Sequence, residues 1–406
     1  MPRPPAQVTG PAPGGGPSGG MKSQPAGRSH RSSAMATPAA RPRPWQAARN
    51  PATLPAGRQR KRNSMTDPAQ WVVVGLDNGG TANNATVLDS AGRFLVDRML
   101  EIPSRVREVP DVAVEALAAS FDYVLTVTGA ARSAVCAVGL DTPGPASADG
   151  VLSSRGAANF AHPGWRGFDI RSGLEARLGL PVVYINDANA AALYAHQVRF
   201  GAEASRYSSV AAIVGTGLGG GVIEAGRVVR GAAGMAGEFG HLQIPLDGLL
   251  DAGQPVPGCN CGLPGDAESI ASLTGIERNL LPYWLSRFEG HDLAGVAPAK
   301  AAKLVRGYGE AGDPLALKIF EQQAMALGRI FTIAAGFTDP DMYFVGGGVV
   351  EADPHFRDWF LGKVREHTEL REEQVRAADF ALVPDLDQAG ARGAAIAARP
   401  ADADRA

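Results

Sequence analysis

A strand followed by a glycine-rich turn occurs twice in this chain, and this repeat limits the possible fold more than any other feature. The apolar run Val72–Leu76 leads into the turn Asp77–Thr81, and Ser209–Val214 leads into Gly215–Gly221. Each turn is followed by a second strand-like segment, so each unit predicts a β-hairpin. A duplicated strand–turn–strand unit followed by helices predicts two α/β lobes with a central cleft between them.

Residues 71–398 otherwise alternate between strand and helix patterns. Short apolar or β-branched runs predict further strands at Ala85–Leu88, Arg93–Leu100, Val135–Leu140, Pro181–Ile185, Gly221–Glu224 and Met342–Val345. Apolar residues at helical spacing predict helices at Val112–Thr128, Arg171–Leu178, Ala188–Val198, Gly275–Ser286 and Leu315–Phe337. This alternation agrees with an α/β fold.

The first 64 residues have a different composition. They are rich in Pro, Gly, Ala, Ser and Arg, and they hold 11 of the 39 Lys and Arg residues but none of the 41 Asp and Glu residues. Such a segment buries too little apolar surface to offset its ordering entropy, so we expect residues 1–64 to form a disordered basic leader. The remainder has 28 basic against 41 acidic residues, a formal charge of −13, which argues against a nucleic-acid partner.

Three interpretations of this leader stay open. Met65 is the true start, or the segment is a dispensable tail, or it is a basic targeting or nucleic-acid arm.

No apolar run approaches the ~20 residues of a membrane-spanning helix, and three cysteines are too few for a disulfide framework. We therefore expect a cytoplasmic protein with no membrane partner. From the duplicated unit we expect the two lobes at residues 65–187 and 188–406.

Both glycine turns are candidate phosphate-binding sites. Glycines let backbone N–H groups approach phosphate oxygens, a threonine hydroxyl can donate a hydrogen bond, and Asp77 can hold Mg²⁺ through water. A plain hairpin would explain one such turn, but two turns in corresponding places carry more glycine than turns need. Neither turn matches a Walker loop or a Rossmann fingerprint, because no helix with the required Lys and Ser/Thr follows.

The segment Asn186–Asn189 lies where a predicted strand ends and a predicted helix begins. Asn or Asp at this point would serve as a helix N-cap. A carboxylate at the carboxyl end of a strand, in a cleft, is also where a general base would lie, which makes Asp187 a candidate. Both interpretations stay open from this segment alone.

A third group of residues has the composition of a metal site. His241, Cys259 and Cys261, with Pro and Gly shaping the loop between them, suggest tetrahedral zinc with a fourth ligand nearby. The alternative is a loop with two buried free thiols.

Seven motifs occur in the order of the ROK (repressor, ORF, kinase) family, which the chain resembles from about Trp71 to Ala398. They are Asp77-x-Gly-Gly-Thr81, Thr142-Pro-Gly-Pro145, Asn159, Asn186–Asn189, Gly215–Gly221, Ala236–His241 and Cys259-x-Cys-Gly-x-x-Gly265. The resemblance implies a two-lobed actin-like ATPase/sugar kinase fold of the ribonuclease H-like type, with a duplicated β-sheet core. It also implies a glucokinase-like enzyme that uses ATP to phosphorylate a hexose at its primary hydroxyl.

The same resemblance implies a role for each matching residue. The general base for the sugar hydroxyl would be Asp187. The sugar would be bound by Asn159, Asn186, Glu238, His241 and Glu268. ATP and Mg²⁺ would be bound by Asp77, Gly79, Gly80, Thr81, Thr216, Gly217, Gly346, Gly347 and Gly348. A structural Zn²⁺ would be bound, in a zinc-knuckle-like loop at residues 241–268, by His241, Cys259, Cys261 and Asp266.

The chain departs from the family pattern at a few positions. Family members with the knuckle usually carry a third Cys where this chain has Asp266. Aspartate also binds zinc, so we expect the site to be retained, and a degraded, empty site is the alternative. Asn78, Ala82 and Ala195 also depart from the pattern, which affects the expected nucleotide geometry and the substrate but leaves Asp187 in place.

Several functions compete within this resemblance. Glucose is the first expected substrate, followed by N-acetylglucosamine, N-acetylmannosamine and fructose; polyphosphate as donor would favour a basic cleft. The alternatives of another class are a non-catalytic sugar-binding protein and a transcriptional regulator, since the family includes repressors with an N-terminal helix-turn-helix. Residues 1–64 contain too much Pro and Gly for that module. The resemblance also implies a homodimer.

Overall fold

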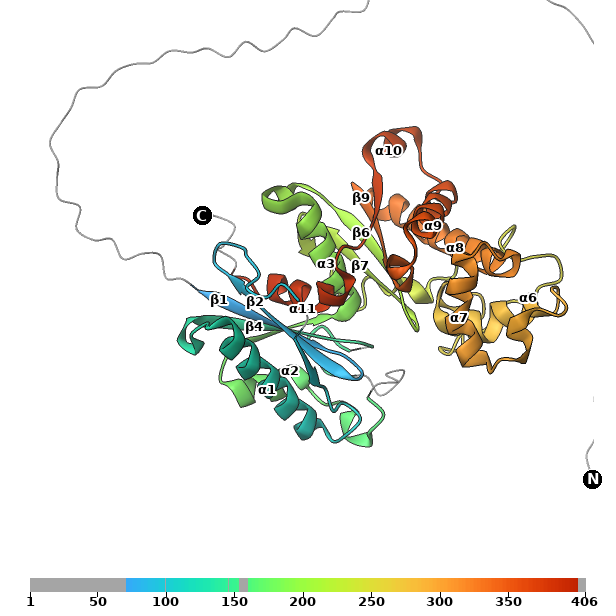
Figure 1. Ribbon diagram of the computed structural model, residues 1–406. Coiled ribbons are helices and arrows are strands. Elements are labelled where there is room, and N and C mark those ends of the chain that lie inside the picture. The colour runs from blue at the N-terminus through green and yellow to red at the C-terminus, as the bar shows by residue number, and fades with distance from the viewer. Residues whose placement is uncertain (1–70, 99, 145, 153–159, 401–406) are drawn as a thin grey trace, which may run out of the picture. The chain divides into compact units, whose positions relative to one another are not determined.

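The computed structural model describes residues 71–98, 100–144, 146–152 and 160–400. The expected leader, residues 1–64, lies outside these residues, and so does Asn159. The described part of the chain contains two five-stranded mixed sheets with helices against their faces (Figure 1). No helix among the described residues is long and apolar enough to cross a membrane.

The first sheet has the strand order β3-β2-β1-β4-β5. Its strands are β1 (Val72–Asn78), β2 (Ala82–Asp89), β3 (Glu101–Pro103), β4 (Val135–Thr142) and β5 (Val182–Asn186). β1, β2 and β3 pair antiparallel, whereas β4 pairs parallel with β1 and with β5. The carboxyl ends of three parallel strands therefore lie at one edge of this sheet, which is where ligands bind in open α/β sheets.

The second sheet repeats this arrangement with the order β10-β9-β6-β7-β8. Its strands are β6 (Ser209–Val214), β7 (Leu218–Glu224), β8 (Arg227–Val228), β9 (Met342–Gly347) and β10 (Asp379–Leu382). β6, β7 and β8 are antiparallel, and β9 pairs parallel with β6 and β10. Because both sheets have the same order and directions, the predicted duplication is confirmed.

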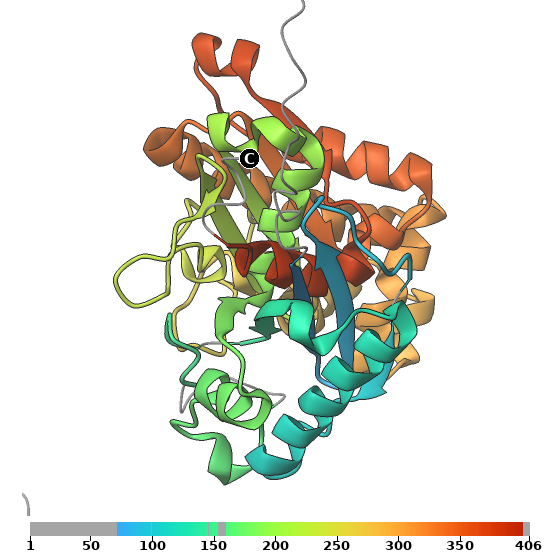
Figure 2. The same cartoon turned by 90° about the vertical axis from the view of Figure 1, so that its left-hand side faces the viewer.

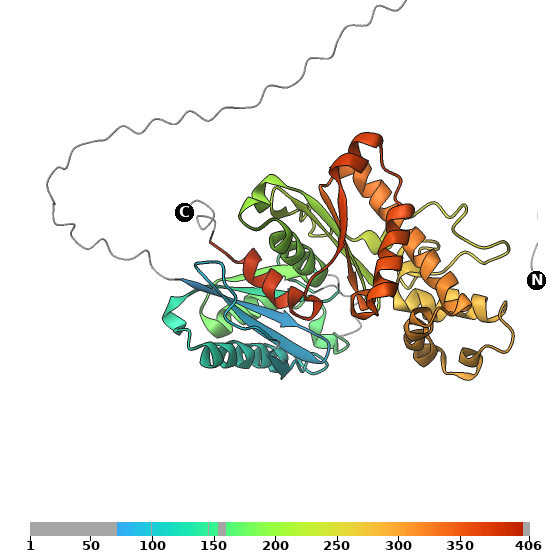
Figure 3. The same ribbon diagram turned by 45° about the horizontal axis from the view of Figure 1, so that its top comes forward.

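Helices cover both faces of each sheet. They are α1 (Pro110–Thr128), α2 (Ile170–Leu178), α3 (Asp187–Phe200), α4 (Glu268–Ala271), α5 (Leu273–Gly275), α6 (Leu281–Leu285), α7 (Pro298–Glu310), α8 (Pro314–Thr338), α9 (Pro354–Glu366), α10 (Glu372–Ala377) and α11 (Leu386–Ala397). α1 and α2 pack on one face of the first sheet, and α11 packs on the other face (Figure 3). α3 and α8 contact the second sheet, and α3 also packs closely on α11.

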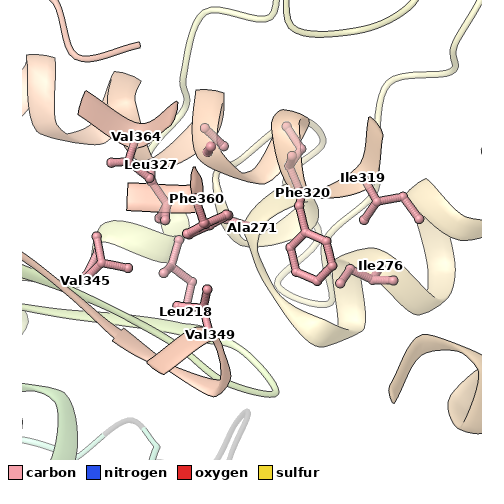
Figure 4. Packing of buried hydrophobic residues seen from close by; sticks show 14 of the residues in the cluster. Leu218, Ala271, Ile276, Ile319, Phe320, Leu327, Val345, Val349, Phe360 and Val364 are labelled. Carbon is pink, nitrogen blue, oxygen red and sulfur yellow. The ribbon is translucent and has the colours of Figure 1, made fainter. Parts of the chain in front are cut away.

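The largest hydrophobic cluster lies between the second sheet and α8. Leu218 and Val345 from the sheet belong to this buried cluster with Leu327, Phe360 and Val364 from the helices (Figure 4). Burial of one such side chain contributes roughly 1.5–3 kcal/mol. This packing provides a rigid support for the β6–β7 turn.

Two predicted elements differ from the structure. The third strand is Glu101–Pro103 instead of Arg93–Leu100, where the described residues form a single bridge between Leu88 and Phe94. The long helix predicted at Gly275–Ser286 is interrupted by a π-helical turn at Ile276–Leu280. Pro282 follows that turn and has no N–H to donate, so a regular α-helical ladder cannot pass through it.

The last helix returns to the first sheet. α11 lies across β1 and β4 and against α3 (Figure 2). Gly75 and Gly139 make this possible, because a Cβ at either would overlap the carbonyl oxygen of Ala391 or Ala394. The expected lobes, 65–187 and 188–406, stay a prediction, with α11 belonging to the second by sequence and packing on the sheet of the first.

Candidate active site

Three carboxylates gather where the parallel strands of the first sheet end. Asp77 lies near the end of β1, Asp141 near the end of β4, and Asp187 directly after β5. Asp77 and Asp141 are paired in register, so their side chains leave the same face of the sheet. Asp187 contributes to the electrostatics of Asp141, and Asp77 to that of Asp187. The three groups therefore form one acidic cluster.

Asp187 is the first residue of α3, and its position is set by the helix cap. Asn186 caps the helix, because its Oδ1 accepts hydrogen bonds from the N–H of Ala188 at 3.0 Å and of Asn189 at 3.4 Å. Asp187 Oδ1 accepts from the Ala188 N–H at 2.7 Å, which leaves Oδ2 free of that bond. The N-cap interpretation of this segment is thus correct for Asn186, whereas the role of Asp187 as a general base stays a prediction.

The pKa of Asp187 is raised to about 7. Burial is the main cause, and the negative charges of Asp77 and Glu238 add to it, while the Ala188 N–H lowers it. Burial likewise raises the pKa of Asp77 to about 6. A carboxyl group with a pKa near neutrality can accept a proton efficiently at physiological pH.

The glycines of the second turn serve packing as well as the turn. A Cβ on Gly219 would lie 2.7 Å from Ala188 Cβ, and one on Gly221 would lie 2.5 Å from Ala192 Cβ. These glycines therefore let α3 lie directly on β7. The excess glycine that suggested phosphate binding is explained at these two positions by helix packing, which fixes Asp187 next to the β6–β7 turn.

The remaining expected nucleotide residues lie at two places. Gly79, Gly80 and Thr81 form the β1–β2 turn, where a Cβ on Gly79 would lie 2.6 Å from the Ala82 carbonyl oxygen. Gly346 and Gly347 end β9 and pair with Ile213 and Val214 of β6, so they lie beside the turn that holds Thr216 and Gly217. Gly347 has φ +105°, a conformation that favours glycine, and Gly348 follows it.

Three expected sugar-binding residues lie near Asp187 and the second turn. Glu238 adds negative charge to the environment of Asp187, and burial raises its own pKa. His241 follows in the 3₁₀ turn Phe239–His241. Glu268 begins α4, where its Oε2 accepts a hydrogen bond from the Leu218 N–H at 2.9 Å. Glu238 interacts electrostatically with both His241 and Glu268, so the three form one group.

The predicted metal ligands converge. His241, Cys259, Cys261 and Asp266 each place one ligand atom within 4.8 Å of the others. Asp266 is fully buried, and its Oδ2 lies 3.2 Å from His241 Nδ1 and 3.3 Å from Cys261 Sγ. Burial and a hydrogen bond to Asp266 raise the pKa of the Cys259 thiol. Two sulfurs, one imidazole nitrogen and one carboxylate oxygen are a donor set that suits zinc.

Sequence reasoning missed Asp141, the central member of the carboxylate cluster. It is fully buried, and among the described residues only the carboxyl group of Asp77 bonds to its side chain. Its pKa is raised, first by burial and then by the charges of Asp77 and Asp187. A signal was present, because Asp141 directly follows the predicted strand Val135–Leu140, as Asp77 directly follows Val72–Leu76. Asp141 belongs to none of the motifs, which begin at Thr142 in this segment.

Comparison with known proteins agrees with this arrangement. A glucokinase of Halalkalibacterium halodurans is 32% identical over 311 residues, covering 73% of this chain and 89% of that protein. An N-acetyl-D-glucosamine kinase of Citrobacter koseri is 32% identical over 283 residues, covering 68% and 83%. The crystal structure of a ROK family glucokinase from Streptomyces griseus with glucose and AMPPNP matches with a TM-score of 0.59 and 30% identity, covering 81% and 99%.

Two sheets of one topology, with acidic residues at the ends of the parallel strands, define an α/β protein of the actin-like ATPase fold. The expected fold class is therefore confirmed. The model of the ROK family matches residues 73–400. The chain belongs to the ROK family, as its motifs indicated.

Proposed function

We propose that this protein transfers the γ-phosphoryl group of ATP to the primary hydroxyl of a hexose, with glucose as the first substrate. The observation that carries this proposal is Asp187, a carboxylate at the start of α3 with a pKa raised to about 7. The relatives named glucokinase and N-acetyl-D-glucosamine kinase support the reaction class.

In this reaction Asp187 takes the proton from the sugar hydroxyl as its oxygen attacks phosphorus. The Ala188 N–H holds Oδ1 of Asp187, so Oδ2 is the atom that would receive the proton. The protein supplies mainly positioning and electrostatic stabilisation, because phosphoryl transfer needs little covalent help. Sugar bound over Asp187 also excludes water that would otherwise hydrolyse ATP.

The nucleotide would lie along the glycine turns. Backbone N–H groups of Gly79, Gly80 and Gly217 and the hydroxyls of Thr81 and Thr216 are the donors available to phosphate oxygens. The half-buried Asp77 provides oxygen atoms, which are the ligands that Mg²⁺ prefers. A bound Mg²⁺ supplies the positive charge that balances the phosphate oxygens.

Asn186, Glu268 and His241 carry polar atoms suited to sugar hydroxyls. Asn186 Oδ1 caps α3, and the Asn186 side chain also bonds to Asp187. Glu268 Oε2 accepts from the Leu218 N–H, and Oε1 accepts from Cys259 Sγ at 3.6 Å and keeps a lone pair for a sugar hydroxyl. His241 Nδ1 faces Asp266, another expected zinc ligand, so Nδ1 would bind zinc. The other ring nitrogen, Nε2, would then bind a sugar hydroxyl, and His241 can serve both roles. Asn159 is proposed from the family motif alone.

A coupled ADP-release assay with Mg²⁺-ATP across hexoses and N-acetylhexosamines tests the reaction. We expect turnover on glucose far above the ATPase rate without sugar, because the relatives include glucokinases of the same fold. Preferred turnover on N-acetylglucosamine would keep the kinase and change its substrate. No turnover on any sugar, with binding still measurable by calorimetry, would contradict the kinase and favour a binding or regulatory protein.

We also propose that the four-ligand group holds a structural zinc ion. Elemental analysis of protein purified without chelator should give about one zinc per chain. Asp266→Ala should lose most of this zinc, whereas Asp266→Cys should retain it, because a thiolate is a stronger zinc ligand.

Cys136→Ser is the matched control for this measurement, since Cys136 lies on β4 outside the ligand group. Zinc content that is unchanged in Asp266→Ala would show that Asp266 is no ligand. The proposal that the protein is a homodimer rests on family membership, and sedimentation at several concentrations tests it.

A further inference from the structure

Three oxygen-bearing side chains form a row across the first sheet. Asn84 of β2 pairs with Asp77 of β1, and Asp77 pairs with Asp141 of β4. Side chains of directly paired residues leave the same face, and adjacent strands are about 4.8 Å apart. The row therefore places two carboxylates next to each other, with the Asn84 amide bonded to Asp77 on its other side.

Burial of two neighbouring carboxylates costs free energy unless a cation or another partner compensates their charge. Asp141 is fully buried, and among the described residues only the carboxyl group of Asp77 bonds to its side chain. Among those residues, no Lys, Arg or His forms an ion pair with Asp77 or Asp141. Buried charges are normally paired or bound to a metal, because desolvation is otherwise uncompensated.

The helix above the pair presents a glycine to the two carboxylates. α11 crosses this face of the sheet (Figure 2), and its residue over the pair is Gly390. A Cβ on Gly390 would lie 3.2 Å from Asp77 Oδ2 and 3.2 Å from Asp141 Oδ2. The two carboxylates thus approach one point from adjacent strands. Asp77 is only half-buried, so the pair can be reached from its side.

We propose that Asp141 is a second direct carboxylate ligand, with Asp77, of a divalent cation of the magnesium class, and that the cation binds before any nucleotide. Carboxylate oxygens are the ligands that such ions prefer. The inference deepens the proposed kinase function on which its role rests, because this cation lies at the base of the β1–β2 turn where phosphate oxygens would approach. Asp141 would then fix the metal, and Asp187 would remain the base.

Titration of the full chain with Mn²⁺, without nucleotide or sugar, tests this site by electron paramagnetic resonance. We expect one Mn²⁺ site that Mg²⁺ displaces, and Asp141→Asn should weaken it at least about 10-fold, since loss of a group that only supports a ligand already costs about 10–100-fold. Asp149→Asn is the matched control, because Asp149 is an exposed aspartate in the loop after β4. It should leave Mn²⁺ affinity unchanged.

Equal Mn²⁺ affinity in Asp141→Asn and the unchanged protein would overturn the proposal and indicate that the two carboxyl groups share a proton. Gly390→Ala is a second variant in case Asp141→Asn does not fold, because its methyl group would stand against both carboxylates and should also weaken Mn²⁺ binding. If Asp141→Asn loses the Mn²⁺ site and the unchanged protein phosphorylates no sugar, the metal site is supported and the proposed kinase function is contradicted. If the unchanged protein phosphorylates a sugar and both variants bind Mn²⁺ as tightly as it does, the kinase function is supported and the metal-site proposal is contradicted.

Discussion

Replacement of Asp187 by asparagine should reduce kcat/KM for sugar phosphorylation about 10²–10⁴-fold, the usual contribution of a general base. Asparagine has nearly the same shape, and its Oδ1 can still accept the Ala188 N–H that now bonds to Asp187. The start of α3 and the Asn186 cap should therefore be preserved, and calorimetry should find sugar binding retained. The coupled ADP-release assay gives the rate.

The pH dependence distinguishes a missing base from a damaged fold. Because the pKa of Asp187 is raised to about 7, kcat/KM should rise as pH increases toward about 7 and then level off. A carboxyl whose folded pKa exceeds its unfolded value of 3.8 stabilises the fold at low pH and loses that contribution as pH rises through about 7. Asp187→Asn removes this titration, so at pH 8 the inactive variant should melt no earlier than the unchanged protein.

Asp111→Asn is the matched control, since Asp111 is an exposed aspartate in the first turn of α1. It should keep full activity. Substantial sugar-dependent turnover in Asp187→Asn would remove Asp187 as the base. Glu238, whose pKa is also raised by burial, would then be the next carboxylate to test.

Local patterns were enough to predict the residues around Asp187. The strands before Asp77 and Asn186, the glycine turns and the start of α3 all depend on neighbours in sequence, and the structure contains each of them. The duplication could also be predicted, because each hairpin is contiguous. The short third strand could not, since Glu101–Pro103 has too few residues for a periodic pattern and depends on pairing with β2.

Contacts between distant segments could not be predicted. Nothing near Leu386–Ala397 indicates that this helix returns to β1 and β4. Its small residues allow close packing only because glycines of the two strands lie opposite them. The use of Gly219 and Gly221 to seat α3 is of the same kind. Asp141 acquires its importance from Asp77, 64 positions earlier in the sequence, through strand register.

Gly393→Ala in α11 should lower the free energy of unfolding by about 1–3 kcal/mol, the usual cost of overpacking a core. In an exposed helix the same change would stabilise by up to about 1 kcal/mol, because alanine has the higher helix propensity. The sign reverses at Gly393 because its Cβ would overlap the backbone carbonyl of Ala190 in α3. Backbone cannot rotate away as a side chain can, so α3 and α11 would have to separate.

Gly362→Ala provides the matched control, because Gly362 is an exposed glycine in α9 with nothing within 4 Å of an added Cβ. Denaturant titration of both variants should show Gly362→Ala as stable as the unchanged protein or more so, and Gly393→Ala clearly less stable. Since α3 begins at Asp187 and α11 covers Asp77 and Asp141, Gly393→Ala should also lose phosphorylation activity at temperatures where it remains folded. Full activity and stability in Gly393→Ala would mean that the two helices do not pack as closely in solution, and that the position of Asp187 does not depend on this contact.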